Sequence, residues 1–266
     1  MRKSLPVFRR ALRETWRGML GWTIGVAAVL FMYLPLFPSI GGNGQMQQII
    51  DSLPSELVSA LGYDQIGTGA GYTQGTFYGL IGFLLLTIAA TSWGAAAIAG
   101  AEESGRLEID LAHGVGRIGY ALESAAAILV RLLWLGLFAG AVVAMLNGPA
   151  QLGIEPIRIV DATVVFVGLT ALAGSSALFV GALSGRRSWG VAAGAGIAVA
   201  GYAFNAIANQ VESAAWLRTI SPYSWAFHQP PLVEGLDPTG AVSLWALSLL
   251  LIAGSAWGLR RRDVIG

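Results

Sequence analysis

The sequence contains no cysteine, a single lysine and few charged residues of either sign. Without cysteine the chain can form neither a disulfide nor a thiolate metal site, and it cannot use a cysteine nucleophile. Charged residues make up 12% of the 266 residues, against about 25% in a soluble domain, and hydrophobic residues make up 55%. The formal net charge of +1 gives no indication of a nucleic acid partner. This composition is that of a polytopic membrane protein.

Six apolar runs are each long enough to cross a bilayer as a helix, which takes about 20 residues. They cover residues 19–37, 77–100, 119–146, 159–183, 189–208 and 240–259. Backbone N–H and C=O groups find no partner in hydrocarbon, so these runs must be helical. We therefore expect an all-α membrane protein with six transmembrane helices, forming a single transmembrane domain over residues 1–266.

The basic residues predict the orientation of these spans. Thirteen of the sixteen precede the first span, lie between spans two and three or four and five, or follow the last span. Because cytoplasmic loops are enriched in Lys and Arg, we expect both termini in the cytoplasm and the chain in a bacterial-type plasma membrane. Residues 38–76 and 209–239 then form external loops.

Residues 1–18 are basic and carry apolar side chains at helical spacing. The apolar residues are Leu5, Phe8, Leu12 and Trp16, and arginines occupy much of the rest of the helical wheel. This pattern predicts an amphipathic helix that lies along the cytoplasmic interface. The alternative is a merely solvated basic leader.

Both external loops contain segments that can form short helices. Within residues 38–76, the stretch MQQIIDSLPSELVSALGY suits one or two amphipathic helices. Residues 209–239 are interrupted by prolines, and their Trp216, Tyr223 and Trp225 suit a membrane–water boundary. We expect short external helices there, before the last span.

A charged segment, residues 101–117 (AEESGRLEIDLAHGVGR), interrupts the apolar sequence between spans two and three. From Gly105 to His113 the spacing predicts a cytoplasmic helix of about two turns, with Leu107 and Leu111 on one face. Exposed leucines among acidic residues suit contact with a partner protein. An ordinary solvated loop is the alternative.

This segment, called the coupling segment below, resembles the coupling helix of ABC type-2 transporter permeases. The matching residues are Glu102, Glu103, Gly105, Leu107, Glu108, Leu111, Val115 and Arg117. The sequence departs from the family pattern at Arg106, Asp110, Gly114 and Gly116. Two further stretches, SPYSWAFHQPPLVEGLDPTG and LRRRDVIG, are similar to later parts of the same family, and LPSELVSALG resembles the first external loop of its polyketide-antibiotic and multidrug exporter branch.

The resemblance implies the permease subunit of an ATP-driven exporter for an apolar or amphipathic compound such as a drug, antibiotic or lipid. It also implies two copies of a separate ABC ATPase subunit, and a second permease copy or a homologous permease. A P-loop needs a lysine after a glycine-rich loop, and Lys3 has no glycine ahead of it. ATP and Mg are therefore expected on the partner subunit, with no cofactor and no catalytic residue in this chain. His113 and His228 lie too far apart to form a metal site unaided.

Four polar residues are candidates for the transport path or for structural contacts: Glu123, Arg131, Asn205 and Asn209. An unpaired arginine in the middle of a span costs about 2.5–3.5 kcal/mol, so Arg131 must face protein or water. It either contacts substrate or pairs with Glu123 or another helix. Asn205 and Asn209 either line a path or form interhelical hydrogen bonds.

Three other classes of protein remain as alternatives. An ion-coupled secondary transporter or channel would need acids or a broken helix at mid-membrane, where this chain has one arginine. An intramembrane enzyme of the protease type would need its catalytic residues within the spans, and both histidines fall in loops. A membrane anchor or sensor that transports nothing is the third.

Overall fold

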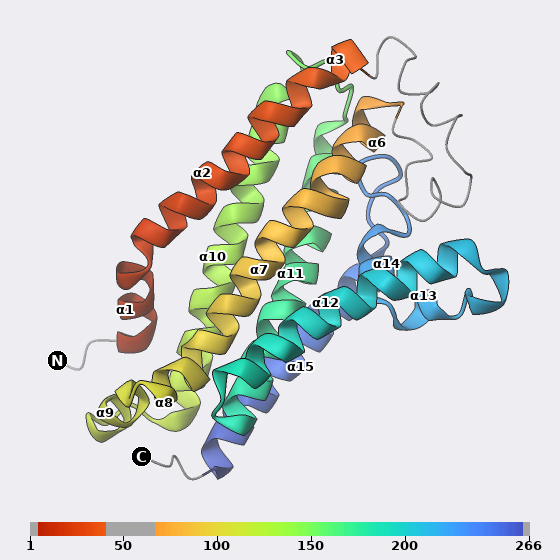
Figure 1. The fold of residues 1–266 in the computed structure, drawn as a ribbon. Coiled ribbons are helices and arrows are strands. Elements are labelled where there is room, and N and C mark those ends of the chain that lie inside the picture. The colour runs from red at the N-terminus through yellow and green to blue at the C-terminus, as the bar shows by residue number, and fades with distance from the viewer. Residues whose placement is uncertain (1–4, 41–66, 263–266) are drawn as a thin grey trace.

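The computed structural model describes residues 5–40 and 67–262, and this part of the chain is helical without a β-strand. Six helices in it are long and apolar enough to cross a membrane, as the composition predicts. They cover Trp16–Ser39, Gly69–Glu103, Arg117–Leu146, Pro156–Ser184, Arg187–Gln210 and Pro238–Arg261. In Figure 1 they form one bundle, with α1 and the last turns of α15 at the end where α9 lies.

The first two spans are assembled from several helical pieces. The first consists of α2 (Trp16–Tyr33), η1 (Leu34–Leu36) and α3 (Phe37–Ile40). The second consists of α6 (Gly69–Thr73), the π-helical η2 (Gln74–Ile81), α7 (Gly82–Ala95), the π-helical η3 (Ala96–Gly100) and α8 (Ala101–Glu103).

The other spans are single helices. These are α10 (Arg117–Leu146), α11 (Pro156–Ser184), α12 (Arg187–Gln210) and α15 (Pro238–Arg261). Helix α1 (Pro6–Glu14) precedes the first span and α9 (Arg106–Ala112) lies between the second and third. Three short helices, η4 (Glu212–Ala214), α13 (Leu217–Ile220) and α14 (Pro222–Phe227), lie between α12 and α15, where short helices are expected.

The second helix is longer than the expected run of residues 77–100. It begins at Gly69 because the Thr68 hydroxyl caps it, accepting a hydrogen bond from the Gly71 N–H (3.0 Å). The last part of the expected loop 38–76 is therefore helical. The amphipathic helices expected in the stretch MQQIIDSLPSELVSALGY lie outside the described residues.

Helix α11 lies at the centre of the bundle. It contacts α7, α10, α12 and α15, and 83% of its most apolar stretch is buried, against 22% for the first span. Glycines allow these close contacts: a Cβ on Gly94 of α7 would lie 2.2 Å from the carbonyl oxygen of Gly174. A Cβ on Gly136 of α10 would lie 2.2 Å from Cγ2 of Val167. Small residues at helix interfaces let the backbones approach in this way.

Helix α1 packs against α10 with the face opposite to its predicted apolar stripe. Val7 is buried in the bundle, whereas Phe8 and Leu12 of the stripe are half-buried and Leu5 and Trp16, which flank α1, are 53% and 54% exposed. The protein therefore covers the stripe only in part. This orientation leaves it available to lipid, as an interfacial helix requires.

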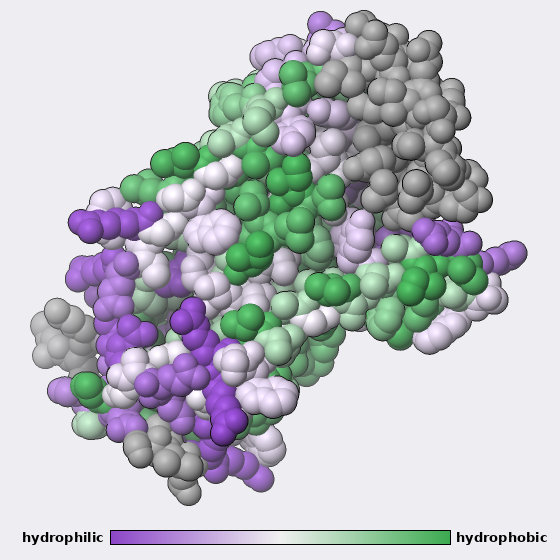
Figure 2. All heavy atoms as spheres, viewed as in Figure 1, coloured by the Kyte–Doolittle hydropathy of each residue, from purple (hydrophilic) through white to green (hydrophobic). Residues whose placement is uncertain are grey.

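The surface divides into a hydrophilic end and an apolar middle. Figure 2 shows hydrophilic residues gathered at the end that holds α1, α8 and α9, with hydrophobic residues above them. Large apolar side chains on the spans, such as Leu137, Val199 and Leu250, are more than 60% exposed. Exposed apolar surface of this extent is suited to a lipid environment.

Replacing Gly94 by alanine should destabilise the bundle. The added Cβ meets backbone of α11, which cannot rotate away, and overpacking of this kind costs about 1–3 kcal/mol. Thermal unfolding of the purified chain measures the loss. Gly196→Ala is the control, because a Cβ there meets nothing within 4 Å. Equal melting temperatures for the two variants would contradict the contact.

Candidate functional site

The coupling segment forms two short helices joined by a glycine turn. The Gly105 N–H donates to the Glu102 carbonyl (2.8 Å), and Gly105 has a φ of +70°, which favours glycine. Helix α9 follows and lies within the expected range 105–113. It ends where the Gly114 N–H donates to the Leu111 carbonyl (3.0 Å), and Gly114 again has a positive φ of 84°.

The leucine face of α9 points into the protein. Leu107 is fully buried in a cluster that includes Val7 of α1 and Tyr120 of α10, and the half-buried Leu111 packs against the same cluster. The interpretation of Leu107 as an exposed docking residue is therefore wrong. Residues four apart share a helix face, and here that face meets apolar side chains of the chain itself.

The opposite side of α9 carries the exposed apolar residue, Ile109. Its side chain is 59% exposed, and Arg106, Ala112 and His113 are exposed beside it. We call these four residues the α9 outer face. Ile109 lies two positions from each leucine, about 200° around the helix, so the same spacing that pairs the leucines places Ile109 on the other side. The position of Ile109 opposite the leucines could therefore have been predicted from the spacing in the sequence.

Two acidic residues of the coupling segment, Glu102 and Glu103, bind other parts of the chain. Glu102 forms an ion pair with Arg262, just after α15. Oε1 of Glu103 accepts a hydrogen bond from the N–H of Arg187, the first residue of α12 (2.8 Å). A carboxylate at a helix N-terminus also interacts favourably with the helix dipole. Nη1 of Arg117 donates to the Arg262 carbonyl (2.8 Å).

Helix α1 is bound to the same segment by charge. Asp110 accepts two hydrogen bonds from the Arg10 guanidinium, one of them Nη1–Oδ1 at 2.6 Å. This interaction raises the pKa of Arg10 above its ordinary value. Arg106 Nη1 lies 3.6 Å from Glu14 Oε2 on α1. Glu108 forms no ion pair within residues 5–40 and 67–262. The coupling segment thus connects α1, α12 and α15.

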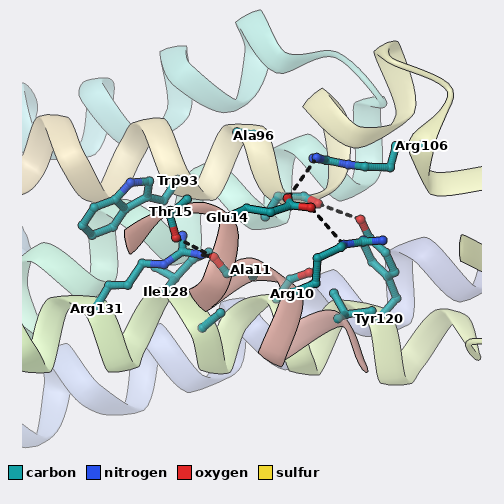
Figure 3. A pocket seen from close by; sticks show the side chains of 14 residues that line it. Arg10, Ala11, Glu14, Thr15, Trp93, Ala96, Arg106, Tyr120, Ile128 and Arg131 are labelled. Atoms are coloured by element: carbon teal, nitrogen blue, oxygen red, sulfur yellow. Dashed lines mark hydrogen bonds and ion pairs between the residues drawn. The ribbon is translucent and has the colours of Figure 1, made fainter. Parts of the chain in front are cut away.

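Glu123 and Arg131 both bind α1 rather than each other. The N–H groups of Val7 and Phe8 donate to Glu123 Oε2 (2.8 and 3.0 Å), so Glu123 caps α1. Nη2 of Arg131 donates to the Ala11 carbonyl (2.6 Å), as Figure 3 shows. Of the two structural partners expected for Arg131, Glu123 is therefore wrong, and another helix, α1, is the one found. The partners lie more than a hundred residues away in sequence, where spacing within one helix gives no information.

Asn205 and Asn209 connect α12 to the short helices that follow it. The Ser224 hydroxyl of α14 donates to Asn205 Oδ1 (2.9 Å). Arg218 of α13 donates to Asn209 Oδ1 (3.3 Å). Both amide oxygens thus accept hydrogen bonds from other helices of the chain.

An apolar groove of about 290 Å³ lies between α7 and α12. Its lining includes Leu84, Thr87 and Ile88 on one side and Ala195 and Val199 on the other. The Thr87 hydroxyl is buried and has no hydrogen-bond partner among the described residues. We call this the α7–α12 groove. The spacing of Leu84 and Ile88 in the sequence predicts that they share one face of a helix. It does not predict that α12 forms the other wall of the groove.

Residues 8–260 match the model of a protein family described as "Multidrug efflux system permease Rv1217c, C-terminal domain". The chain belongs to this family. The match includes the coupling segment and nearly all of the six long helices, and it confirms the resemblance to ABC type-2 permeases. No curated protein matches the chain.

The chain is thus the permease of a multidrug efflux system, an ABC exporter. Membership of this family decides against the ion-coupled transporter or channel. The permease has six candidate spans and is a multi-pass membrane protein.

The contact between Arg10 and Asp110 in this permease should be measurable by charge exchange. Arg10→Asp and Asp110→Arg should each lower the melting temperature, because each places like charges side by side. The double exchange restores opposite charges and should recover part of the loss, with a coupling energy of about 1 kcal/mol for a partly exposed pair. Strictly additive effects in thermal unfolding would refute the contact.

Proposed function

We propose that a separate ATPase subunit docks on the α9 outer face and drives export of an apolar or amphipathic compound along the α7–α12 groove. One observation carries this proposal: the coupling segment is joined to both helices that form the groove walls. It continues from α7 through η3 and α8, and Glu103 Oε1 accepts a hydrogen bond from the first N–H of α12 (2.8 Å). A displacement of α9 would therefore act on both walls.

The ATPase is expected in two copies, together with a second permease copy or a homologous permease. The absence of a P-loop lysine in this sequence supports a separate ATP-binding subunit. ATP and Mg bound there would supply the free energy. The positive-inside distribution supports a cytoplasmic position for both termini and for the α9 outer face, in a plasma membrane.

The buried side of α9 would transmit the movement. Leu107 is fully buried between α1 and α10, so α9 cannot shift without its neighbours. Close-packed side chains move together rather than deform continuously. Conformational change also requires that the ATPase bind the two states of the permease with different affinity.

The dimensions and lining of the groove support an apolar substrate. Its volume of about 290 Å³ is just below the ~300–1,000 Å³ range of small-molecule sites. Its walls are almost entirely apolar, with the Thr87 hydroxyl and Tyr202 as polar contributors. A substrate with one hydrogen-bond acceptor near Thr87 would satisfy that buried group.

Ile109→Asp should release the ATPase subunit without unfolding the permease. The charge replaces an exposed apolar contact, so the melting temperature should stay near that of the parent. Mass spectrometry of the complex from gently solubilised native membranes should show a P-loop subunit in stoichiometric amount with the parent, and at least about tenfold less with the variant.

Two controls separate docking from folding. Ile157→Asp changes an isoleucine of nearly equal exposure (60%) at the start of α11 and should retain the subunit. Leu107→Asp places a charge in a buried site and should lower stability directly. Retention of the P-loop subunit by Ile109→Asp would refute docking at the α9 outer face, and absence of such a subunit from the parent would refute the ATP-driven mechanism.

Filling the groove should block transport while leaving the complex assembled. Ala195→Trp places an indole between the groove walls, so efflux of an apolar fluorescent compound from cells should fall several-fold. Ala253→Trp, at an exposed position of α15, should transport like the parent. Equal efflux by both variants would place the path elsewhere.

A further inference from the structure

Arg131 is a buried cation without a counter-ion in the part of the chain that the structure describes. Its residue surface is 6% exposed, and it forms no ion pair there. The guanidinium makes one hydrogen bond, to the Ala11 carbonyl (2.6 Å), and lies 5.5 Å from the Trp93 ring centre. Its Nε is buried and has no partner among the described residues. A guanidinium has five N–H donors, and a buried charge is costly unless it is paired.

This guanidinium borders a cavity of about 160 Å³ between α1, α10 and the second span. In Figure 3, Arg131 and Trp93 lie at one end of the cavity, and Arg10, Arg106 and Glu14 lie at the other. We call it the arginine cavity. A single water needs only about 10–15 Å³ in this measure, so a phosphate-sized group can enter.

The charge balance of the arginine cavity is positive. Its lining contains three arginines and one acid, Glu14. Arg10 is neutralised by Asp110, and Glu14 lies within 3.6 Å of Arg106 and 3.9 Å of Arg10. The charge left without compensation is that of Arg131. An anion is the ligand that this balance selects.

Two features indicate that the anion belongs to a lipid. Tryptophans gather at the level of Arg131: Trp93 packs edge-on against Trp22 (6.4 Å between ring centres), and Trp134 lies three positions along α10. Arg131, expected in the middle of its span, thus lies level with the start of the first span, since it binds Ala11 and Trp134 donates to Thr23. Indoles prefer the headgroup level of a bilayer. The cavity lining also includes apolar side chains such as Ile128, and Leu5 and Trp16, on either side of the adjoining α1, are exposed. Apolar surface beside a cationic pocket matches an amphiphile with an anionic head.

We propose that the arginine cavity binds the phosphate group of an anionic membrane lipid, with Arg131 as its principal contact. A planar guanidinium can donate two parallel hydrogen bonds to one phosphate, which suits the unused donors of Arg131. The lipid would fasten α1 to α10 and the second span at the point where α1 meets the coupling segment. The proposal needs only that the chain lies in a bilayer and does not depend on the ATPase partner.

The test uses the full chain in nanodiscs of phosphatidylcholine, with and without phosphatidylglycerol. For the parent, phosphatidylglycerol should raise the melting temperature, because a ligand that binds the folded state stabilises it. Native mass spectrometry should show retained phosphatidylglycerol. Arg131→Gln should weaken retention about tenfold, the usual effect of losing a charge-assisted hydrogen bond. The hydrogen bonds from Val7 and Phe8 to Glu123 do not involve Arg131, so α1 should remain docked.

Two further variants test whether the lipid is lost because of the cavity itself or because of a change in charge. Ala96→Leu fills the cavity without changing charge and should also lose the lipid. Arg13→Gln removes an exposed charge from α1 outside the cavity and should retain it. Phosphatidylglycerol retained equally by Arg131→Gln and the parent would overturn the site. Stabilisation by inorganic phosphate in pure phosphatidylcholine, without an effect of phosphatidylglycerol, would overturn the lipid as its source.

Discussion

The rest of the structure depends on the close contact of α12 with α7 and α11. A Cβ on Gly190 would lie 2.9 Å from the Ala177 carbonyl oxygen, and one on Gly194 would lie 2.8 Å from that of Ala173. These glycines hold the first turns of α12 against the bundle. The same glycines meet α7, since these Cβ atoms would lie 3.1 Å from Ala95 Cβ and 2.7 Å from Thr91 Oγ1. Farther along α12, beyond Gly194, the α7–α12 groove lies between these two helices.

That contact also explains the position of the coupling segment. The segment continues directly from α7, and its Glu103 carboxylate holds the N-terminus of α12, just before the tightly packed glycines. Glu102 and Asp110 add ion pairs to the end of α15 and to α1. Because Leu107 is buried among these elements, the segment is part of the packed structure rather than an appended loop. The exposed Ile109 of the α9 outer face is where we propose that force enters from outside the chain.

The sequence predicts the six long helices because the bilayer demands about 20 apolar residues for each, and that constraint acts on every span separately. It also predicts the extent of α9, since Gly105 and Gly114 permit the positive φ angles at its ends. Periodicity shows that Leu107 and Leu111 share a face, but not whether that face is inside or outside. The contacts of Glu123 and Arg131 with α1 depend on tertiary packing between distant parts of the chain, which a single sequence does not contain.

The central claim is that the coupling segment moves the walls of the α7–α12 groove relative to one another. The chain has no cysteine, so Leu84→Cys and Val199→Cys would carry the only spin labels on the permease, one on each wall at an exposed position. Double electron–electron resonance in the complete transporter measures the distance between them. The account predicts a distance distribution that shifts when ATP is added and stays fixed when Glu103 is also replaced by alanine. A distribution unaffected by ATP, or a shift that persists without Glu103, would contradict it.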